Sequence, residues 1–283
     1  MKRVIGFFLA LVLASAADAE NAVRFVYKEP ESRRDAAIKQ EMEVLLPVDN
    51  VVRMLNDVFV IPRPLTIILG GDEGPSHDLE SNEILLPYRF VGEVKDFFKQ
   101  HNYQETGVGI QDAAMDVTLY VLLHEIAHAM IGMFDYPTLS GREENAADEL
   151  TTVLLLEFFD DGTEVVISAA DLVDLRSKAE TGAAKEDFWD LHDFLGEPRY
   201  YRTLCYVYGS NPKEYPELLE GTGITKQGAQ VCINDYKKLT NDWSFMLGPY
   251  IKPGPEQPAG ADAAESDPES KAPQTAPHSH LAP

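Results

Sequence analysis

One stretch of the sequence decides which fold and function the other residues are compared with. It is Val121-Leu122-Leu123-His124-Glu125-Ile126-Ala127-His128-Ala129-Met130. Its apolar residues enclose two histidines and a glutamate. It lies inside the longest helical candidate of the chain, residues 111–133. Burying such polar side chains in an apolar helix without a partner costs free energy. The stretch therefore predicts a buried helix whose polar side chains share a bound ligand.

The polar residues of this helix have the spacing H-E-x-x-H. His124 and His128 are four positions apart, so both imidazoles project from one helix face and can bind one Zn²⁺ ion. Glu125 lies one position further round, where its carboxylate can act as general base on a water molecule that the metal activates. An exposed helix with two unrelated histidines is the alternative, and the apolar flanks argue against it.

A third ligand is expected from the acidic segment at residues 142–149. Glu144 and Asp148 are four positions apart and share a helix face. Glu144 can complete the zinc site, and Asp148 can accept the remaining ring N–H of a ligating histidine, with His124 the preferred partner. Glu143 and Glu149 are the alternative ligands, although neither has an aspartate four residues later.

The pattern H-E-x-x-H followed by E-x-x-A-D resembles the gluzincin metallopeptidases. From about residue 23 to residue 250, the chain is also similar to a family of small exported bacterial proteins catalogued as metallopeptidases of unknown function. The residues that carry this second resemblance are the segment Leu204–Pro212, Cys232 and Trp243. The resemblance implies zinc-dependent peptide hydrolysis with two histidines and one glutamate on the metal and a supporting aspartate.

Peptide hydrolysis also requires a group that stabilises the oxyanion of the tetrahedral intermediate. His192, flanked by acidic residues on both sides, is the preferred candidate, ahead of Arg199 and Tyr201. The gluzincin resemblance further implies an edge strand that holds the substrate extended, which would be Ile84–Leu86. The other histidines of the folded part, His77 and His101, are expected to face solvent.

Short β-rich runs and helical patterns precede the motif. Strands are expected at residues 24–28, 65–69 and 84–86, and the turn-rich residues 70–75 suggest a hairpin-like pair. Helices are expected at residues 35–42, 48–59, 90–100, 111–133 and 142–159, with further helices beyond residue 168. The predicted fold class is α+β, with a small β-sheet followed by a zincin active-site helix and a mostly helical C-terminal part.

Residues 1–19 have the features of a cleavable signal peptide. Lys2 and Arg3 precede a short apolar run, and Ala17-Asp18-Ala19 fits the small-x-small cleavage rule. An uncleaved anchor is the alternative, but the run is short, and no later apolar run approaches the roughly 20 residues that span a bilayer. We expect a periplasmic or secreted protein without membrane association after cleavage.

Cys205 and Cys232 are the two cysteines of the chain. In an oxidising compartment an even pair predicts one disulfide, and two buried free thiols are the alternative. Closing a loop of this length would contribute roughly 3 kcal/mol to the free energy of unfolding.

The chain is expected to divide into four parts. These are the signal peptide at 1–19, a zincin-like part with the metal site at 20–165, a helical part at 166–252 and a disordered Pro/Ala-rich tail at 253–283. The tail has no aromatic residue, and its two histidines, His278 and His280, are expected to be flexible rather than metal-binding.

The net charge and the motifs together limit the classes of function that the sequence allows. The chain has 47 acidic and 24 basic residues, a formal net charge of −23, which argues against nucleic-acid binding. The expected function is an exported zinc metallopeptidase, endo- or aminopeptidase, that acts on peptide or protein substrates. A non-catalytic zinc-binding or interaction protein on a zincin scaffold is the alternative, and a helical protein with a chance motif is a third. The sequence leaves the oligomeric state open.

Overall fold

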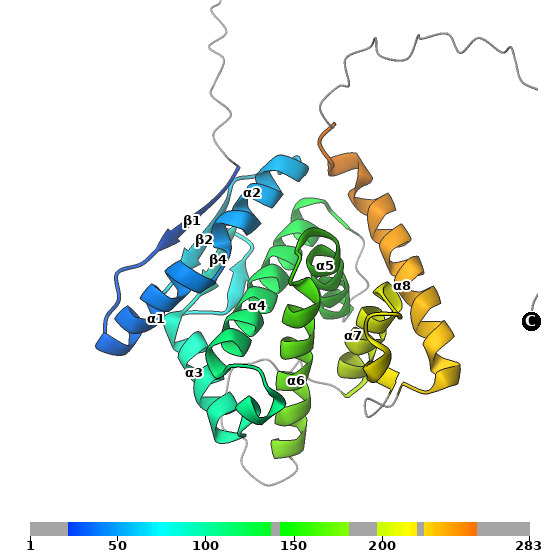
Figure 1. The fold of residues 1–283 in the computed structure, drawn as a ribbon. Helices are drawn as coiled ribbons and strands as arrows, with labels where there is room; N and C mark the ends of the chain where they lie inside the picture. Colours follow the sequence, from blue (N-terminus) through cyan, green and yellow to red (C-terminus); the bar gives the residue numbers. More distant parts are fainter. Residues whose placement is uncertain (1–21, 137–141, 181–196, 220–223, 254–283) are drawn as a thin grey trace, which may run out of the picture. The chain divides into compact units, whose positions relative to one another are not determined.

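The computed structural model describes residues 22–136, 142–180, 197–219 and 224–253, and for residues 179, 180 and 197–200 the backbone alone. The described residues up to Lys252 form one compact unit by their contacts. The described part has a small sheet near its N-terminus followed by helices (Figure 1). The predicted α+β class is therefore confirmed.

The sheet has four strands in the order β1-β2-β4-β3. They are β1 (Val23–Tyr27), β2 (Leu65–Leu69), β3 (Ser76–Asp78) and β4 (Glu83–Leu86). Strand β2 runs parallel to both β1 and β4, whereas β3 pairs antiparallel with β4. The expectation that residues 65–69 and 84–86 form a hairpin-like pair is wrong, because the antiparallel partner of β4 is the short β3. Its three polar residues lack the apolar alternation that marks a strand.

Two helices, α1 (Arg33–Leu45) and α2 (Val48–Val58), form the crossover that makes β1 and β2 parallel. Ser32 caps α1, since its hydroxyl oxygen accepts a hydrogen bond from the Asp35 backbone N–H at 3.0 Å. Pro47 precedes α2, which buries Val48, Val51 and Leu55 and packs on β1.

The central element is α4 (Ile110–Met133), which follows α3 (Tyr88–Gln100) and the short 3-10 helix η1 (Tyr103–Thr106). It packs against α3, α5 and α6 and against strands β3 and β4 (Figure 1). Among the described residues, α4 is the one helix long and apolar enough to cross a membrane, contrary to our expectation that no such run follows residue 19. However, 89% of that window is buried, as in the core helix of a folded domain.

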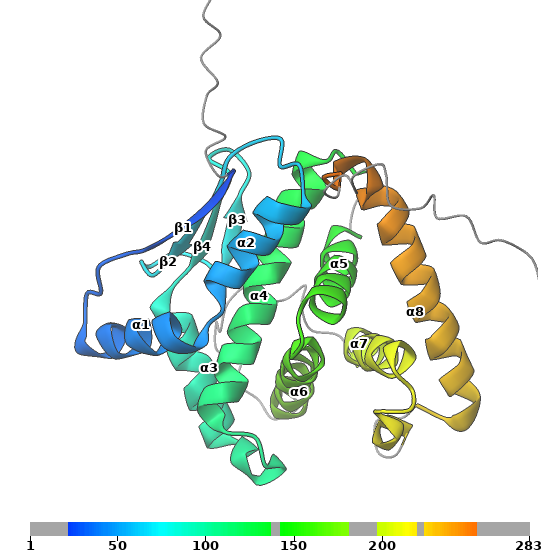
Figure 2. The same cartoon turned by 45° about the horizontal axis from the view of Figure 1, so that its top comes forward.

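Helices α5 (Glu143–Phe158) and α6 (Gly162–Glu180) lie beside α4, as both views show (Figure 2). The turn between them depends on Gly162, because a Cβ atom there would lie 2.0 Å from the Leu155 carbonyl oxygen. Both helices pack against α4.

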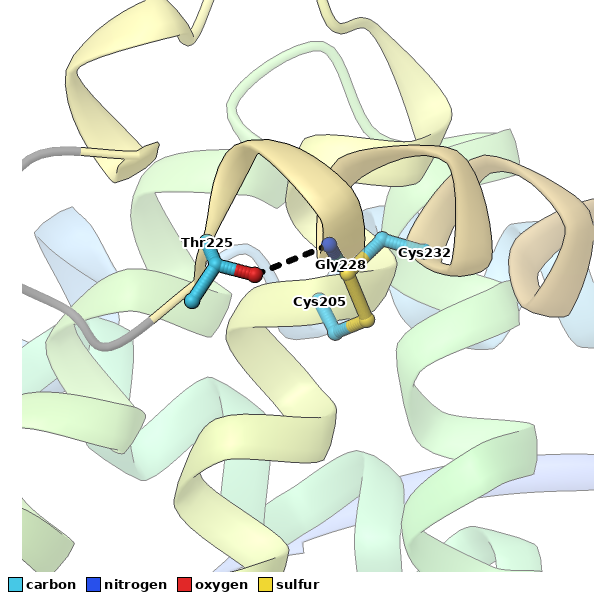
Figure 3. Close-up of a disulfide and its surroundings, with 4 residues drawn as sticks. All are labelled: Cys205, Thr225, Gly228 and Cys232. Carbon is cyan, nitrogen blue, oxygen red and sulfur yellow. Dashed lines mark hydrogen bonds between the residues drawn. A yellow bond between two sulfur atoms is a disulfide. The ribbon is translucent and has the colours of Figure 1, made fainter.

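Helices α7 (Glu197–Ser210) and α8 (Lys226–Leu247) are joined by the predicted disulfide, Cys205–Cys232 (Figure 3), with the 3-10 helix η3 (Pro216–Leu219) between them. Thr225 caps α8 by accepting the Gly228 backbone N–H at 3.0 Å. A disulfide indicates a protein that functions outside the cytoplasm.

After α8 and the 3-10 helix η4 (Gly248–Tyr250), the chain returns to the end of α2. Ile251 forms a β-bridge with Phe59, and the Lys252 N–H donates to the Val58 carbonyl oxygen at 2.8 Å. The Tyr250 ring stacks on Phe134 with centroids 3.9 Å apart. The C-terminal end of the folded unit is thus fastened to its N-terminal part. The division at residue 165 and the leader at residues 1–19 stay predictions.

Candidate metal centre

Helices α4 and α5 bring three candidate metal donors together. His124 is fully buried on α4, and His128 lies one turn later on the same face. Glu144, in the first turn of α5, faces both: its Oε2 is 3.3 Å from His124 Nε2 and its Oε1 is 3.3 Å from His128 Nε2. The two Nε2 atoms are themselves 3.0 Å apart.

The donor atoms of these three residues all lie within 4.8 Å of one another, so the group could hold a metal ion. Two imidazole nitrogens and one carboxylate form a donor set that is typical of metal sites with an open coordination position. The three residues are those that the sequence analysis selected. The identity of the metal does not follow from this geometry.

Each histidine has a carboxylate on its outer ring nitrogen. His124 Nδ1 lies 3.1 Å from Asp148 Oδ1, and His128 Nδ1 lies 3.1 Å from Glu143 Oε1. Such partners fix the orientation and tautomer of a ligating imidazole. Asp148 has the place that its spacing predicted. Glu143, an alternative ligand in the sequence analysis, lies on the outer side of His128 instead.

The other alternative ligand, Glu149, points elsewhere. Its carboxylate accepts a hydrogen bond from the Tyr206 hydroxyl at 3.4 Å and lies 3.7 Å from the Arg202 guanidinium. Tyr120, which the sequence analysis did not select, places its hydroxyl 3.5 Å from Asp148 Oδ1. Its position four residues before His124 on the same helix was a signal that could have identified it.

The three candidate metal donors shift one another's pKa values. Hydrogen bonds from His124 and His128 hold the pKa of the Glu144 carboxyl well below its usual range. Burial lowers the pKa of the His128 ring, but Glu144 and Glu143 outweigh this and raise it to about 9. Without a metal the centre therefore carries an ionised carboxylate and favours cationic imidazole, and a metal cation would replace the imidazole protons.

Glu125 is 8% exposed and lies beside the donors. Burial raises the pKa of its carboxyl, and the nearby His124 and His128 oppose this. The His77 backbone in β3, a strand that packs on α4, lies near the Glu125 carboxyl and lowers its pKa. A buried carboxyl held next to a metal-binding group, with its pKa raised, has the properties of a proton acceptor.

The edge strand that contacts α4 is β3, although β4 also packs on this helix. Strand β4 lies inside the sheet between β2 and β3, so the prediction that it is the edge strand is wrong. The prediction that His77 faces solvent is also wrong: it is half-buried, and its Nε2 lies 3.0 Å from Asn82 Oδ1. His101 is half-buried too, with its Nδ1 2.9 Å from the Phe97 carbonyl oxygen.

The predicted oxyanion-stabilising residues are not brought to the centre within the described part. His192 and the side chain of Arg199 lie outside the described residues. Tyr201 is 40% exposed on α7. The assignment of His192 stays a prediction.

A small sheet followed by a helix pair that presents two histidines and a glutamate defines a candidate metalloprotein. Residues 27–247 match the model of the DUF4344 family, described as “Putative metallopeptidase”. The chain belongs to this family, which confirms the resemblance noted from the sequence and supports peptidase activity. A comparison with curated proteins finds no match, and a comparison with solved structures finds none either.

Proposed function

We propose that this protein is an exported zinc metallopeptidase that hydrolyses peptide bonds with Glu125 as general base. The observation that carries the proposal is the position of the buried Glu125 carboxylate beside the group formed by His124, His128 and Glu144. Membership of the metallopeptidase family supports the same reaction class.

Zinc is the metal that this donor set favours. His124 and His128 would contribute Nε2 atoms and Glu144 a carboxylate oxygen, which leaves a position for water or substrate. When bound, Zn²⁺ supplies Lewis-acid chemistry that activates water and polarises the scissile carbonyl. Asp148 and Glu143 would keep the two rings oriented through their Nδ1 atoms.

Glu125 would carry the proton transfers. One of its carboxylate oxygens would accept a proton from the attacking water, and the same group would then donate a proton to the leaving amine. Burial, which raises its pKa, brings the proton affinity of Glu125 closer to that needed at neutral pH.

The substrate would be a peptide or protein segment bound in extended form. Strand β3 is an edge strand of the sheet and contacts α4, the helix that carries the motif. An extended peptide can add to such an edge through main-chain hydrogen bonds. We therefore assign to β3 the role that the sequence analysis gave to Ile84–Leu86.

Export belongs to the same proposal. The charged and apolar segments of residues 1–19 match a signal peptide, and the Cys205–Cys232 disulfide fits an oxidising compartment such as a periplasm or the medium. Cleavage after Ala19 would release residues 20–283.

The test compares metal content and turnover in residues 20–283 and four variants. We expect about one zinc per wild-type chain, lost in His124→Ala and Glu144→Ala but retained in Glu149→Ala, the matched control on the same helix. Glu125→Ala should retain zinc and lose peptide hydrolysis by at least about 1000-fold. Absence of stoichiometric zinc from the wild-type protein would overturn the proposal. Bound zinc without hydrolysis across a peptide library would favour the non-catalytic alternative.

A further inference from the structure

A cavity of about 640 Å³ lies between α2, α4 and the turn that joins α5 to α6. Leu45 at the end of α1 and Pro47 also line it. Small-molecule sites in proteins usually have volumes of about 300–1000 Å³. The cavity therefore has the volume of a site for a small ligand.

The cavity is separate from the candidate metal centre. Met115 and Leu119 line it from α4, nine and five positions before His124. A helix turns by about 100° per residue, so these two side chains project about 180° and about 140° away from His124. None of the described residues that line the cavity is a candidate metal donor or an outer partner of one. A ligand bound in the cavity would therefore not need the metal.

Most of the lining is apolar. Nine of the fifteen described lining residues are apolar, and Met115, Leu119 and Val165 among them are buried. Two others are open to water, since Phe158 is 42% exposed and Leu45 is 41% exposed. Removing apolar surface from water is favourable. A ligand with an apolar body would therefore gain free energy by covering these two side chains.

The polar residues of the lining are mainly acidic. Four of them are aspartates, namely Asp57, Asp116, Asp160 and Asp161. The cation among the described lining residues is Arg53, whose guanidinium donates to Asn50 Oδ1 on the same helix. With the aspartates ionised, four negative charges and one positive charge give the lining a formal charge of −3. The lining is therefore electrostatically complementary to a cation.

One of these aspartates has a fixed position in the cavity wall. Asp116 is half-buried on α4, and its Oδ2 accepts a hydrogen bond from the Ser168 hydroxyl on α6 at 2.8 Å. A carboxylate has two oxygens, so Asp116 can accept a further bond without losing that of Ser168. Bonds from an ammonium group to a carboxylate are charge-assisted and stronger than bonds from a neutral hydroxyl. Asp116 therefore favours an ammonium group over a neutral donor.

Two segments of the chain outside the described residues do not match the charge of the cavity. Residues 181–196 contain four acidic residues and one lysine, and residues 254–283 contain five acidic residues and one lysine. Both segments are anionic, so the acidic lining repels them. The charge of the cavity instead favours a cationic ligand from outside the chain.

We propose that this cavity is a second binding site, which takes an organic amine of small-molecule size with an apolar body. The ammonium group would pair with Asp116 and the acidic residues around it, and the apolar body would cover Phe158 and Leu45. This site goes beyond the proposed peptide hydrolysis, because it uses neither the metal donors nor Glu125.

Three indole compounds that differ in their head groups test the site. Tryptamine is cationic, tryptophol is neutral and indolepropanoate is anionic. Their affinities for residues 20–283 are measured at about pH 7.5, where Asp116, whose pKa burial raises to about 6, is ionised. We expect tryptamine to bind at least about fivefold more tightly than tryptophol, and indolepropanoate to bind more weakly still. Equal affinities for tryptamine and tryptophol would overturn the proposal.

Methionine methyl groups report where the amine binds. Met54 and Met115 line the cavity, whereas Met130 and Met246 do not. In an NMR titration of the methyl-labelled protein, tryptamine should shift the signals of Met54 and Met115 and leave those of Met130 and Met246 unchanged. Binding that shifts neither Met54 nor Met115 would overturn the proposal.

Charge variants test the role of Asp116. Asp116→Asn keeps the size of the side chain and an oxygen acceptor for Ser168. It should weaken tryptamine binding by about fivefold and leave tryptophol binding within about twofold of wild type. Asp49→Asn is the matched control, because it removes the same charge from an exposed position on α2 that does not line the cavity. Its tryptamine affinity should stay within about twofold of wild type.

His124→Ala separates this proposal from the proposed function. Because the cavity does not use the metal donors, this variant should bind tryptamine within about twofold of the wild-type affinity even though it loses zinc. A protein without zinc or peptide hydrolysis would overturn the proposed function and leave the amine site intact. Unchanged tryptamine binding in Asp116→Asn would overturn the amine site alone.

Discussion

Two groups of acidic side chains lie along helix α4. The two groups differ in the side chains that donate hydrogen bonds to their carboxylates. At the metal centre, Glu144 faces the rings of His124 and His128. Near the start of the helix the donors are hydroxyl groups. There the Ser168 hydroxyl donates to Asp116 at 2.8 Å, and the Tyr103 hydroxyl donates to Asp171 at 2.7 Å. We call these four residues the hydroxyl–carboxylate group.

The two groups shift carboxyl pKa values in opposite directions. Glu144 has a pKa well below its usual range because it accepts from two imidazoles. Burial raises the pKa of Asp116 to about 6, and the nearby Asp112 and Glu164 add to the effect against the opposing Ser168 bond. Burial of acids on a core helix is therefore no sign of a metal site by itself. The convergence of metal-ligating donors on one point distinguishes the centre.

The largest expected effect is the loss of metal binding on changing a ligand. His124→Ala should weaken zinc binding by more than about 100-fold, because losing a ligand costs more than losing an outer partner. Added zinc should therefore raise the melting temperature of the wild-type protein but not of this variant. Asp116→Asn, in the hydroxyl–carboxylate group, is the control and should bind zinc like wild type. If wild type and His124→Ala bound zinc with equal affinity, the metal centre would not differ from the hydroxyl–carboxylate group in metal binding.

The next effect concerns the outer partners of the histidines. Asp148→Asn should weaken zinc binding by about 10- to 100-fold, because its carboxylate orients the buried His124 ring. Glu143→Gln should cost less than about tenfold, since the Glu143 side chain is 50% exposed and that of Asp148 is 14% exposed. Competition with a chromogenic chelator measures both affinities. The reverse order would mean that Glu143 is the stronger support.

In the hydroxyl–carboxylate group, removing a donor should affect stability rather than metal binding. Tyr103→Phe leaves the partly buried Asp171 carboxylate without its hydroxyl partner and should lower the free energy of unfolding by about 1–2 kcal/mol. Urea unfolding measures the change, and zinc titration provides the control. A tenfold loss of zinc affinity in this variant would show that the two groups are coupled through α4.

The smallest effect is a pH dependence at Asp116. Its pKa rises from an ordinary value of 3.8 to about 6 in the folded protein, so the folded state binds more protons between these values. Stability should therefore fall as pH increases from about 4 to about 6. Asp116→Asn cannot ionise and should be more stable than wild type by about 1 kcal/mol at pH 8, with no gain at pH 4. Melting temperatures at both pH values test this, and a gain at pH 4 alone would contradict it.

The sequence was most informative where residues at fixed helical spacing carry the chemistry. His124, His128, Glu144 and Asp148 lie on two helices whose faces follow from i, i+4 spacing, so their convergence could be predicted before any tertiary contact was known. The same reasoning did not exclude Glu143 and Glu149 as alternative metal ligands. Helical spacing gives the angle between side chains, but only tertiary packing determines which of them faces α4.

The sheet was less predictable. Strand β3 has three polar residues in a turn-rich region, so periodicity gives no signal for it. Its edge position arises from pairing with β4, and the parallel pairing of β2 with β4 depends on how the chain crosses between them. His77 was misjudged for this reason: its partner Asn82 lies in the adjoining turn, and β3 packs on α4, which comes later in the chain.

The fastening of the C-terminal segment to α2 has a consequence for the order of folding. Lys252 hydrogen-bonds to the carbonyl oxygen of Asn56, 196 positions earlier in the chain, whereas the metal donors come from one helical hairpin. Contacts between distant segments pay a larger loop-closure entropy and form later than local ones. We expect the helical hairpin of α4 and α5 to assemble early and the contact between Lys252 and Asn56 to form last.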